Sequence, residues 1–330
     1  MKDLPKDIGS LSTIIENNYL YVDKTKYVYK MAKPGKKYFL SRPRRFGKSL
    51  LLSTLEELYA GNKKIFKDLY IYDKWNWSKK YPIVHIDFAG MSYGDLNILK
   101  RSLNNFLEKT AEKHDLIISS GNLLTDKFKE LLEKINIKYE EKVVVLIDEY
   151  DKAILDNIDD LEKADNIRKE LNSFYGILKS TENEVEFIFI TGVTKFAKTS
   201  IFSGLNNITD LTMHPDYANI CGYTQEELET YFSERIEDLA DYYSASKEEV
   251  LDNIRNCYNG YSYNGNDTFY NPYSILSLFD EKTFDNFWFE SGTPSFLMEY
   301  LKNNLQYIGT LFNPNVTIIV SSGKFKTNHK

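Results

Sequence analysis

The chain has 330 residues, of which 42% are apolar and 15% aromatic, enough for one large domain or a core with a smaller appendage. Its formal net charge is −6. This charge argues against a dedicated nucleic-acid-binding protein, whose surface is normally basic overall, although a local basic patch is compatible with it.

Five short apolar runs are predicted to be strands of one sheet, with a weaker signal in the last: 37–41, 83–88, 143–147, 186–191 and 208–213. Three longer segments between them place apolar residues at helical spacing: 49–60, 95–113 and 161–178. Strands that alternate with helices favour right-handed crossovers. The fold class is therefore predicted to be α/β, with a mainly parallel sheet between two layers of helices.

The pattern becomes helical after about residue 215. Residues 224–227 and 246–249 each place Thr or Ser three positions before Glu, which is the spacing of a capping box. They predict two helices that run to about Tyr243 and Cys257. A further helix is predicted to begin at Pro272, since proline is favoured in the first turn. This region is predicted to form a compact helical lid.

Phosphate binding is predicted where the first strand leads into RPRRFGKS at residues 42–49 and a helix follows. Backbone N–H groups at the start of a helix are unpaired and bind anions, and glycine at position 47 allows close approach. Lys48 suits the β and γ phosphates, and the Ser49 hydroxyl suits magnesium. The expected nucleotide-binding residues are Arg44, Arg45, Phe46, Gly47, Lys48, Ser49 and Leu50.

This loop departs from the usual GxxxxGK[ST] pattern, because Arg42 stands at the position of the first glycine. An ordinary strand-to-helix turn is the alternative interpretation. Arg42, Arg44 and Arg45 are candidates for phosphate contacts or for arginine fingers that act in trans. A solvated basic loop is the alternative for each of them.

Two acidic residues, Asp148 and Glu149, follow the apolar run 143–147, at the end of a predicted strand where α/β sheets bind ligands. Asp148, with Ser49, is predicted to hold Mg²⁺, and Glu149 to polarise the attacking water. Alternatively, the two acids only begin a polar loop. Thr191 ends the next strand and is predicted to sense the γ-phosphate or position water or, equally well, to satisfy local backbone groups. The predicted catalytic residues are Glu149, Lys48 and Thr191.

With these motifs in place, the chain resembles the AAA-ATPase-like proteins of bacteria, a P-loop group near the STAND and archaeal ATPases. The resemblance rests on residues 21–25, 42–49, 146–152, 191–195, 221–224, 258–261, 271–274 and 291–295. It implies a sheet of order 5-1-4-3-2 and a helical or winged-helix lid. An arginine at the first P-loop position is usual in that family, so the resemblance implies that Arg42 is a family variant.

The resemblance also implies, in many members, a C-terminal nuclease domain of the PD-(D/E)xK type. No matching acidic motif follows Ser295, so nuclease activity is not predicted for this chain. The predicted organisation is a P-loop core at 1–215, a helical lid at 216–302 and a truncated tail at 303–330.

Two functions follow from these predictions. The first is a Mg²⁺-dependent ATPase that couples its nucleotide state to the lid and to a partner. The second is a nucleotide-gated binding module that resembles STAND switches and hydrolyses little ATP. The expected ligands are ATP and Mg²⁺. Candidate partners are another protein, a nuclease domain in trans or a second copy of the chain, and nucleic acid is left open.

The remaining groups give weaker signals. Cys221 and Cys257 are expected to be buried reduced thiols, and no signal peptide or spanning helix is visible, so a cytoplasmic protein is expected. No metal-ligand spacing is found for His85, His114, His214 and His329. The stretch with Asp23 and Lys24 is expected either to pack beside the P-loop or the base, or to form a structural ion pair.

Overall fold

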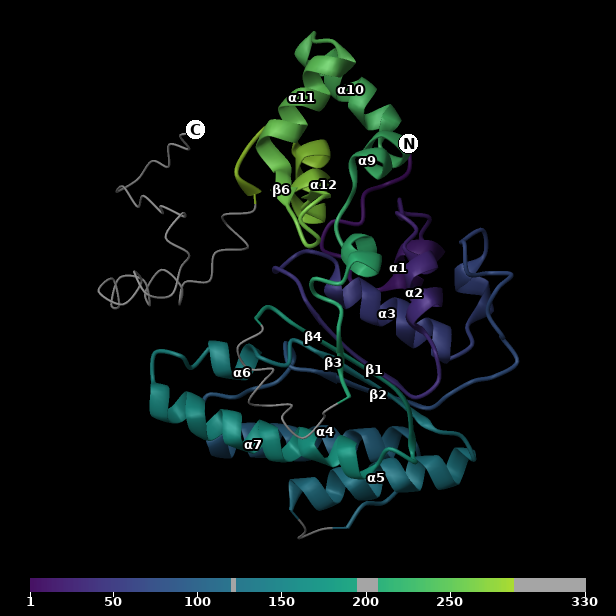
Figure 1. The fold of residues 1–330 in the computed structure, drawn as a ribbon, viewed down its shortest axis with the longest axis vertical. Helices are drawn as coiled ribbons and strands as arrows, with labels where there is room; N and C mark the ends of the chain where they lie inside the picture. Colours follow the sequence, from purple (N-terminus) through teal and green to yellow (C-terminus); the bar gives the residue numbers. More distant parts are fainter. Residues whose placement is uncertain (120–122, 195–206, 288–330) are drawn as a thin grey trace. The chain divides into compact units, whose positions relative to one another are not determined.

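The computed structural model describes residues 1–119, 123–194 and 207–287, and residues Met1–Gly292 form one compact unit (Figure 1). Its centre is a five-stranded parallel sheet in the order β2-β3-β4-β1-β5. The strands are β1 (Lys36–Ser41), β2 (Ile83–Asp87), β3 (Val143–Asp148), β4 (Val185–Gly192) and β5 (Thr209–Asp210). The predicted order 5-1-4-3-2 is therefore confirmed.

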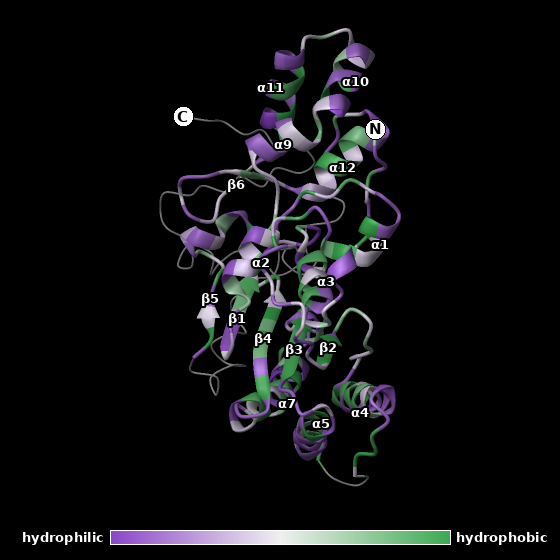
Figure 2. Ribbon diagram, turned by 90° about the vertical axis from the view of Figure 1, so that its right-hand side faces the viewer, coloured by the Kyte–Doolittle hydropathy of each residue, from purple (hydrophilic) through white to green (hydrophobic). Residues whose placement is uncertain are grey.

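Two layers of helices cover the sheet (Figure 1). On one face lie α4 (Leu96–Lys113), α5 (Leu124–Tyr139) and α7 (Leu161–Ser180), and on the other lie α1 (Leu11–Glu16), α2 (Thr25–Met31) and α3 (Lys48–Tyr59). Alternate residues of β3 enter the two layers, Val145 on the first face and Leu146 on the second. Because both faces are buried, β3 is continuously apolar from Val143 to Ile147, and its ribbon is green in Figure 2.

After the sheet, the chain forms a set of helices that we call the helical cluster, residues 224–287. It contains α9 (Gln225–Tyr231), α10 (Ser233–Tyr243), α11 (Lys247–Tyr258) and α12 (Pro272–Glu281), with a hairpin of β6 (Asn259–Tyr261) and β7 (Phe269–Tyr270). Both predicted capping boxes are present, at Thr224 and Ser246. The prediction of one continuous helix to about Tyr243 is wrong. The helix breaks at Phe232 into α9 and α10.

Short elements join these layers: η1 (Lys63–Phe66), α6 (Lys152–Leu155) and η2 (Pro215–Ile220). Cys221 is buried as predicted, but the prediction for Cys257 is wrong, because this thiol is exposed on the outer side of α11. Within the described residues, no helix is long and apolar enough to cross a bilayer. The predicted tail at 303–330 and residues 288–302 of the predicted lid lie outside the described residues.

The end of β4 packs closely against the segment that follows β3. A Cβ atom added at Gly192 would lie 2.3 Å from Cε1 of Tyr150 and 2.8 Å from Oδ1 of Asp151. The ring of Tyr150 is fully buried, and its hydroxyl donates a hydrogen bond to the carbonyl of Thr194 at 3.0 Å. The ring therefore has little room to move, and this position requires glycine.

We expect Gly192→Ala to lower the free energy of unfolding by about 2–3 kcal/mol, because the new methyl group forces the Tyr150 ring out of its place. Gly176→Ala is the matched control, since its Cβ would meet no atom within 4 Å on α7. That change should raise stability by up to about 1 kcal/mol, because alanine favours helices. Urea unfolding of both variants measures the difference, and equal stabilities would contradict the packing described here.

Candidate functional site

The loop between β1 and α3 has the backbone shape of an anion-binding turn. Arg45 has a φ of 62° and Gly47 a φ of 91°, and Gly47 is the N-cap of α3. The left-handed residue just before the helix turns successive N–H groups toward one side of the loop. The first turn of α3, with Lys48 and Ser49, thus begins at the carboxyl edge of the sheet, as predicted.

Three hydrogen bonds converge on the carboxylate of Asp148 at this edge. The Ser49 hydroxyl donates to Oδ2 at 2.6 Å, the Thr191 hydroxyl donates to Oδ1, and the Glu149 N–H also donates to Oδ1 at 3.0 Å. Asp148 and Thr191 are both buried. The structure therefore brings together residues from the P-loop helix, β3 and β4, and Thr191 serves Asp148 and not its local backbone.

Lys48 lies in the hollow of the loop. Its ammonium donates hydrogen bonds to the carbonyls of Arg42 at 3.0 Å and Pro43 at 2.8 Å. Burial lowers the pKa of Lys48, and the charges of Asp148 and Glu149 oppose this effect. The ammonium is a strong donor whose present partners are neutral carbonyls, so an anionic ligand would be the better partner.

Glu149 follows Asp148 and lines the open space beside the loop. Its backbone is left-handed, with a φ of 53°, and its carboxylate lies 4.0 Å from the ammonium of Lys152. Burial raises the pKa of Glu149, and the charge of Asp148 raises it further, whereas Lys152 and Lys48 lower it. A half-buried carboxylate with a raised pKa beside a cleft is typical of a general base.

The three loop arginines have different environments. The solvated interpretation is wrong for Arg42, whose side chain is 1% exposed and donates to the carbonyls of Ser41 and Thr212, both at 2.9 Å. Arg44 lies at the surface, with its guanidinium 4.0 Å from the carboxylate of Asp156. The side chain of Arg45 forms an ion pair with Asp7 and lies 4.5 Å from the ring centroid of Tyr273.

An open cleft runs over this loop, and we call it the phosphate cleft. It is lined from the sheet side by Arg44, Arg45, Gly47, Lys48, Ser49, Glu149 and Lys152. The N-terminal residues Pro5, Asp7, Ile8 and Gly9 and the α12 residues Tyr273 and Leu276 line the opposite side. The N-terminal segment and the helical cluster thus close a cleft whose floor is the P-loop.

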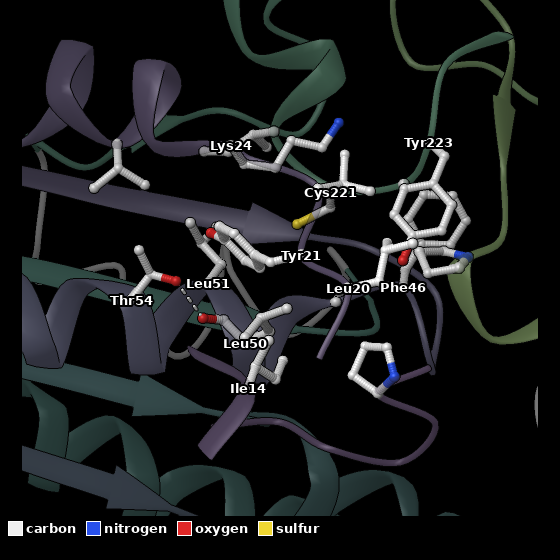
Figure 3. A pocket seen from close by; sticks show the side chains of 17 residues that line it. Ile14, Leu20, Tyr21, Lys24, Phe46, Leu50, Leu51, Thr54, Cys221 and Tyr223 are labelled. Atoms are coloured by element: carbon white, nitrogen blue, oxygen red, sulfur yellow. Dashed lines mark hydrogen bonds between the residues drawn. The ribbon is translucent and has the colours of Figure 1, made fainter. Parts of the chain in front are cut away.

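A second, more apolar pocket lies beside the first turn of α3, and we call it the base-side pocket (Figure 3). Its wall includes Leu20, Tyr21, Phe46, Leu50 and Tyr223. Gly47 and Leu50 line both this pocket and the phosphate cleft. The ring of Phe46 is fully buried, so this predicted ligand residue shapes the pocket from within the core.

The N-terminal stretch lies beside the P-loop helix, and it also forms the ion pair predicted as the alternative. Tyr21 and Lys24 line the base-side pocket beside the P-loop helix. Lys24 also forms the structural ion pair, because its ammonium donates to both oxygens of Glu227 at 2.6 Å. Burial lowers the pKa of Lys24, and the charge of Glu227 opposes it. The capping box of α9 is therefore tied to the segment that borders the site.

One residue close to the site was not singled out for a role by its sequence position. Asp151 is buried, and its Oδ2 accepts hydrogen bonds at 2.7 Å from both the N–H and the hydroxyl of Thr194. It also accepts one at 3.1 Å from the Val193 N–H. Asp151 thereby fixes the loop after Thr191. The signal for it was its place in the 146–152 motif, three residues beyond Asp148.

Comparisons with known proteins identify the family of this chain. Residues 5–202 match a family described as a predicted AAA-ATPase. A protein of Azotobacter chroococcum mcd 1, described as uncharacterized and in the vnfD 5′ region, is 39% identical over 301 residues. The match covers 91% of this chain and 56% of that protein, so this chain spans little more than half the length of the relative.

Solved structures of low similarity are the Orc1 protein of Aeropyrum pernix in complex with DNA and Cdc6p of Pyrobaculum aerophilum. The first is 11% identical with a TM-score of 0.39, and the match covers 74% of this chain and 62% of that one. The second is 11% identical with a TM-score of 0.40, and the match covers 81% of this chain and 63% of that one. The family match spans more than half of the sequence, and the chain belongs to the predicted AAA-ATPase family.

Proposed function

We propose that this protein is an ATPase that binds ATP with Mg²⁺ over the P-loop. The observation that carries the proposal is the hydrogen-bonded set of Ser49, Asp148 and Thr191 beside the P-loop turn. Lys48 and Ser49 line the phosphate cleft, and the Ser49 hydroxyl joins it to the carboxylate of Asp148, which borders an adjacent pocket that Ser49 also lines. Membership of the predicted AAA-ATPase family supports the binding of a nucleotide. The arrangement of these residues supports its hydrolysis.

The residues present fit a magnesium ion. Hard oxygen donors suit Mg²⁺, and the Ser49 hydroxyl and Asp148 carboxylate already lie 2.6 Å apart. Mg²⁺ typically takes only one or two protein ligands, with water and phosphate oxygens filling its other positions. Bound there, Mg²⁺ would neutralise charge on the β and γ phosphates.

The chain's own groups then have distinct tasks. Lys48 exchanges the carbonyls of Arg42 and Pro43 for phosphate oxygens. Glu149 accepts a proton from the attacking water, or orients that water by accepting its hydrogen bond. Thr191 holds Asp148 in one orientation, and Asp151 holds the loop that follows Thr191. The base-side pocket offers an apolar surface for the adenine ring.

A second candidate function, a nucleotide-gated switch with little turnover, is favoured by one set of contacts. Lys6 forms ion pairs with Glu281 at 2.6 Å and Asp280 at 3.4 Å at the end of α12. The next residue, Asp7, forms an ion pair with Arg45 of the P-loop. Two adjacent residues thus join the helical cluster to the phosphate cleft, so nucleotide can affect the surface offered to a partner protein or a second copy.

We expect Glu149→Gln to lower ATP turnover by about 100-fold or more, because the amide cannot accept the proton, while ATP affinity changes little. Phosphate release and binding of a fluorescent ATP analogue measure the two quantities. Glu162→Gln, at an exposed position in the first turn of α7, is the control and should match the wild type. Wild-type turnover in the Glu149 variant would disprove its role. Negligible turnover in the wild type, with ATP binding intact, would favour the switch.

Arg44 and Arg42 are expected to respond in opposite ways. Arg44→Met should weaken ATP binding about tenfold, because a charged donor leaves the phosphate cleft, with stability changed by less than about 0.5 kcal/mol. Arg42→Met should instead cost at least about 2 kcal/mol of unfolding free energy, because buried carbonyls lose their donor. Urea unfolding and nucleotide titration of both variants test this. A stability loss confined to the Arg44 variant would contradict the assignment.

The Asp7–Arg45 ion pair gives a test of coupling. Asp7→Asn should increase ATP affinity by roughly three- to tenfold, because the phosphates no longer compete with a carboxylate for Arg45. It should also weaken the effect of ATP on hydrogen exchange in α12, as followed by mass spectrometry. Asp3→Asn is the control. Unchanged affinity and unchanged exchange in the Asp7 variant would show that this segment transmits nothing.

A further inference from the structure

A third groove lies on the outer side of α2 and shares no lining residue with the phosphate cleft or the base-side pocket. Its charged and aromatic lining consists mainly of Lys26, Tyr29, Lys30, Lys33, Tyr70 and Asp216. These residues come from α2 and the turn after it, from the segment after η1, and from η2. The proposed ATPase mechanism uses none of them.

The sequence of α2 sorts its residues onto two faces. The buried residues of the helix are Thr25, Val28 and Met31. The exposed residues Lys26, Tyr29, Lys30 and Lys33 follow the spacing i, i+3, i+4 and i+7, which places them on a single stripe. Three lysines and one tyrosine therefore share the surface of one short helix and its C-terminal turn.

The opposite wall of the groove is held at a fixed position. Asp23 accepts a hydrogen bond from the Tyr70 N–H at 2.7 Å, and the buried Thr25 hydroxyl accepts one from the Ile71 N–H at 3.2 Å. These bonds join the start of α2 to the segment that carries Tyr70. Tyr70 is 47% exposed and Tyr29 is 40% exposed, so both side chains are accessible from solvent.

The charge in the groove is positive, although the whole chain is acidic. Lys26 and Lys33 form no ion pair with any residue that the structure describes, whereas Lys30 pairs with Asp216 at 2.7 Å. Three lysines thus face one aspartate in a protein of net charge −6. Lys74 adds a fourth cation, 4.1 Å from the ring centroid of Tyr70.

We propose that this groove binds single-stranded nucleic acid. Lys26 and Lys33 would contact phosphates, and unpaired bases would stack on Tyr29 and Tyr70. Basic residues that follow the backbone, with aromatic rings that take the bases, are what sequence-independent single-strand binding needs. The interaction would be local, which is consistent with an acidic protein.

Other anionic partners fit the groove less well. An acidic peptide would use the lysines but would leave the two exposed tyrosine rings without a stacking partner. A duplex hides the faces of its bases and requires a broader basic surface than three lysines supply. The carboxylate of Asp216 repels any polyanion. Its ion pair with Lys30 partly neutralises that negative charge.

The position of α2 gives the groove a route to the ATP site. Val28 on the buried side of the helix and Lys24 at its N-cap both line the base-side pocket. A single helix of seven residues therefore borders both ligands. Binding of the single-stranded nucleic acid requires no ATP. It can therefore be measured independently of ATP hydrolysis.

The test is fluorescence anisotropy of the full chain with a labelled oligothymidylate of about 15 nucleotides, at low salt and without ATP. Binding is expected, and it should weaken as salt rises. Lys26→Glu/Lys33→Glu should raise the Kd at least tenfold. The control is Lys109→Glu/Lys129→Glu, which changes the net charge equally on exposed positions of α4 and α5 and should have a much smaller effect.

Tyrosine variants separate stacking from charge. Tyr29→Ala/Tyr70→Ala should raise the Kd about tenfold or more, whereas Tyr29→Phe/Tyr70→Phe keeps both rings and should bind nearly as the wild type does. The inference is overturned if the wild type does not bind the strand at low salt, or if the control lysine pair weakens binding equally. It is also overturned if the alanine variant binds normally and oligoglutamate competes, which would indicate an acidic protein partner.

Discussion

The site depends on one buried carboxylate, that of Asp148. Its two oxygens accept hydrogen bonds from Ser49 on the P-loop helix and Thr191 on β4, so one residue joins segments about a hundred and forty positions apart. A buried carboxylate is costly unless its oxygens are paired, which gives the fold a physical reason to bring these three segments together. The parallel sheet supplies the geometry, because β1, β3 and β4 end at the same edge.

Much of this arrangement was predictable from the sequence. The strands are short apolar runs because both faces of the sheet are buried, and the order 5-1-4-3-2 came from the resemblance and was confirmed. The meeting of Ser49 with Asp148 followed from the rule that ligands bind at the carboxyl ends of parallel strands. Strong local signals, such as the capping boxes at Thr224 and Ser246, were also correct.

What could not be predicted depends on long-range packing. The charged side chain of Arg42, next to Pro43, was expected to be solvated or to bind a ligand. It is instead buried and donates hydrogen bonds to carbonyls that lie 170 or more positions later in the sequence. Phe232 divides a continuous helical pattern, and its ring stacks on Phe279 of α12. These partners lie far away in the sequence. Composition and periodicity describe only local stretches, so they cannot identify such partners.

Because Arg42 is buried, the P-loop does not hold its shape by its own residues alone. Its guanidinium lies 3.7 Å from the ring centroid of Tyr263 and is held by carbonyls at residues 212, 217 and 218. A glycine at the usual first position would need none of these neighbours. Residues 42–49 transplanted alone into another sheet would therefore lose their anchor. The shape of the loop therefore depends on residues that lie 170 or more positions later in the sequence.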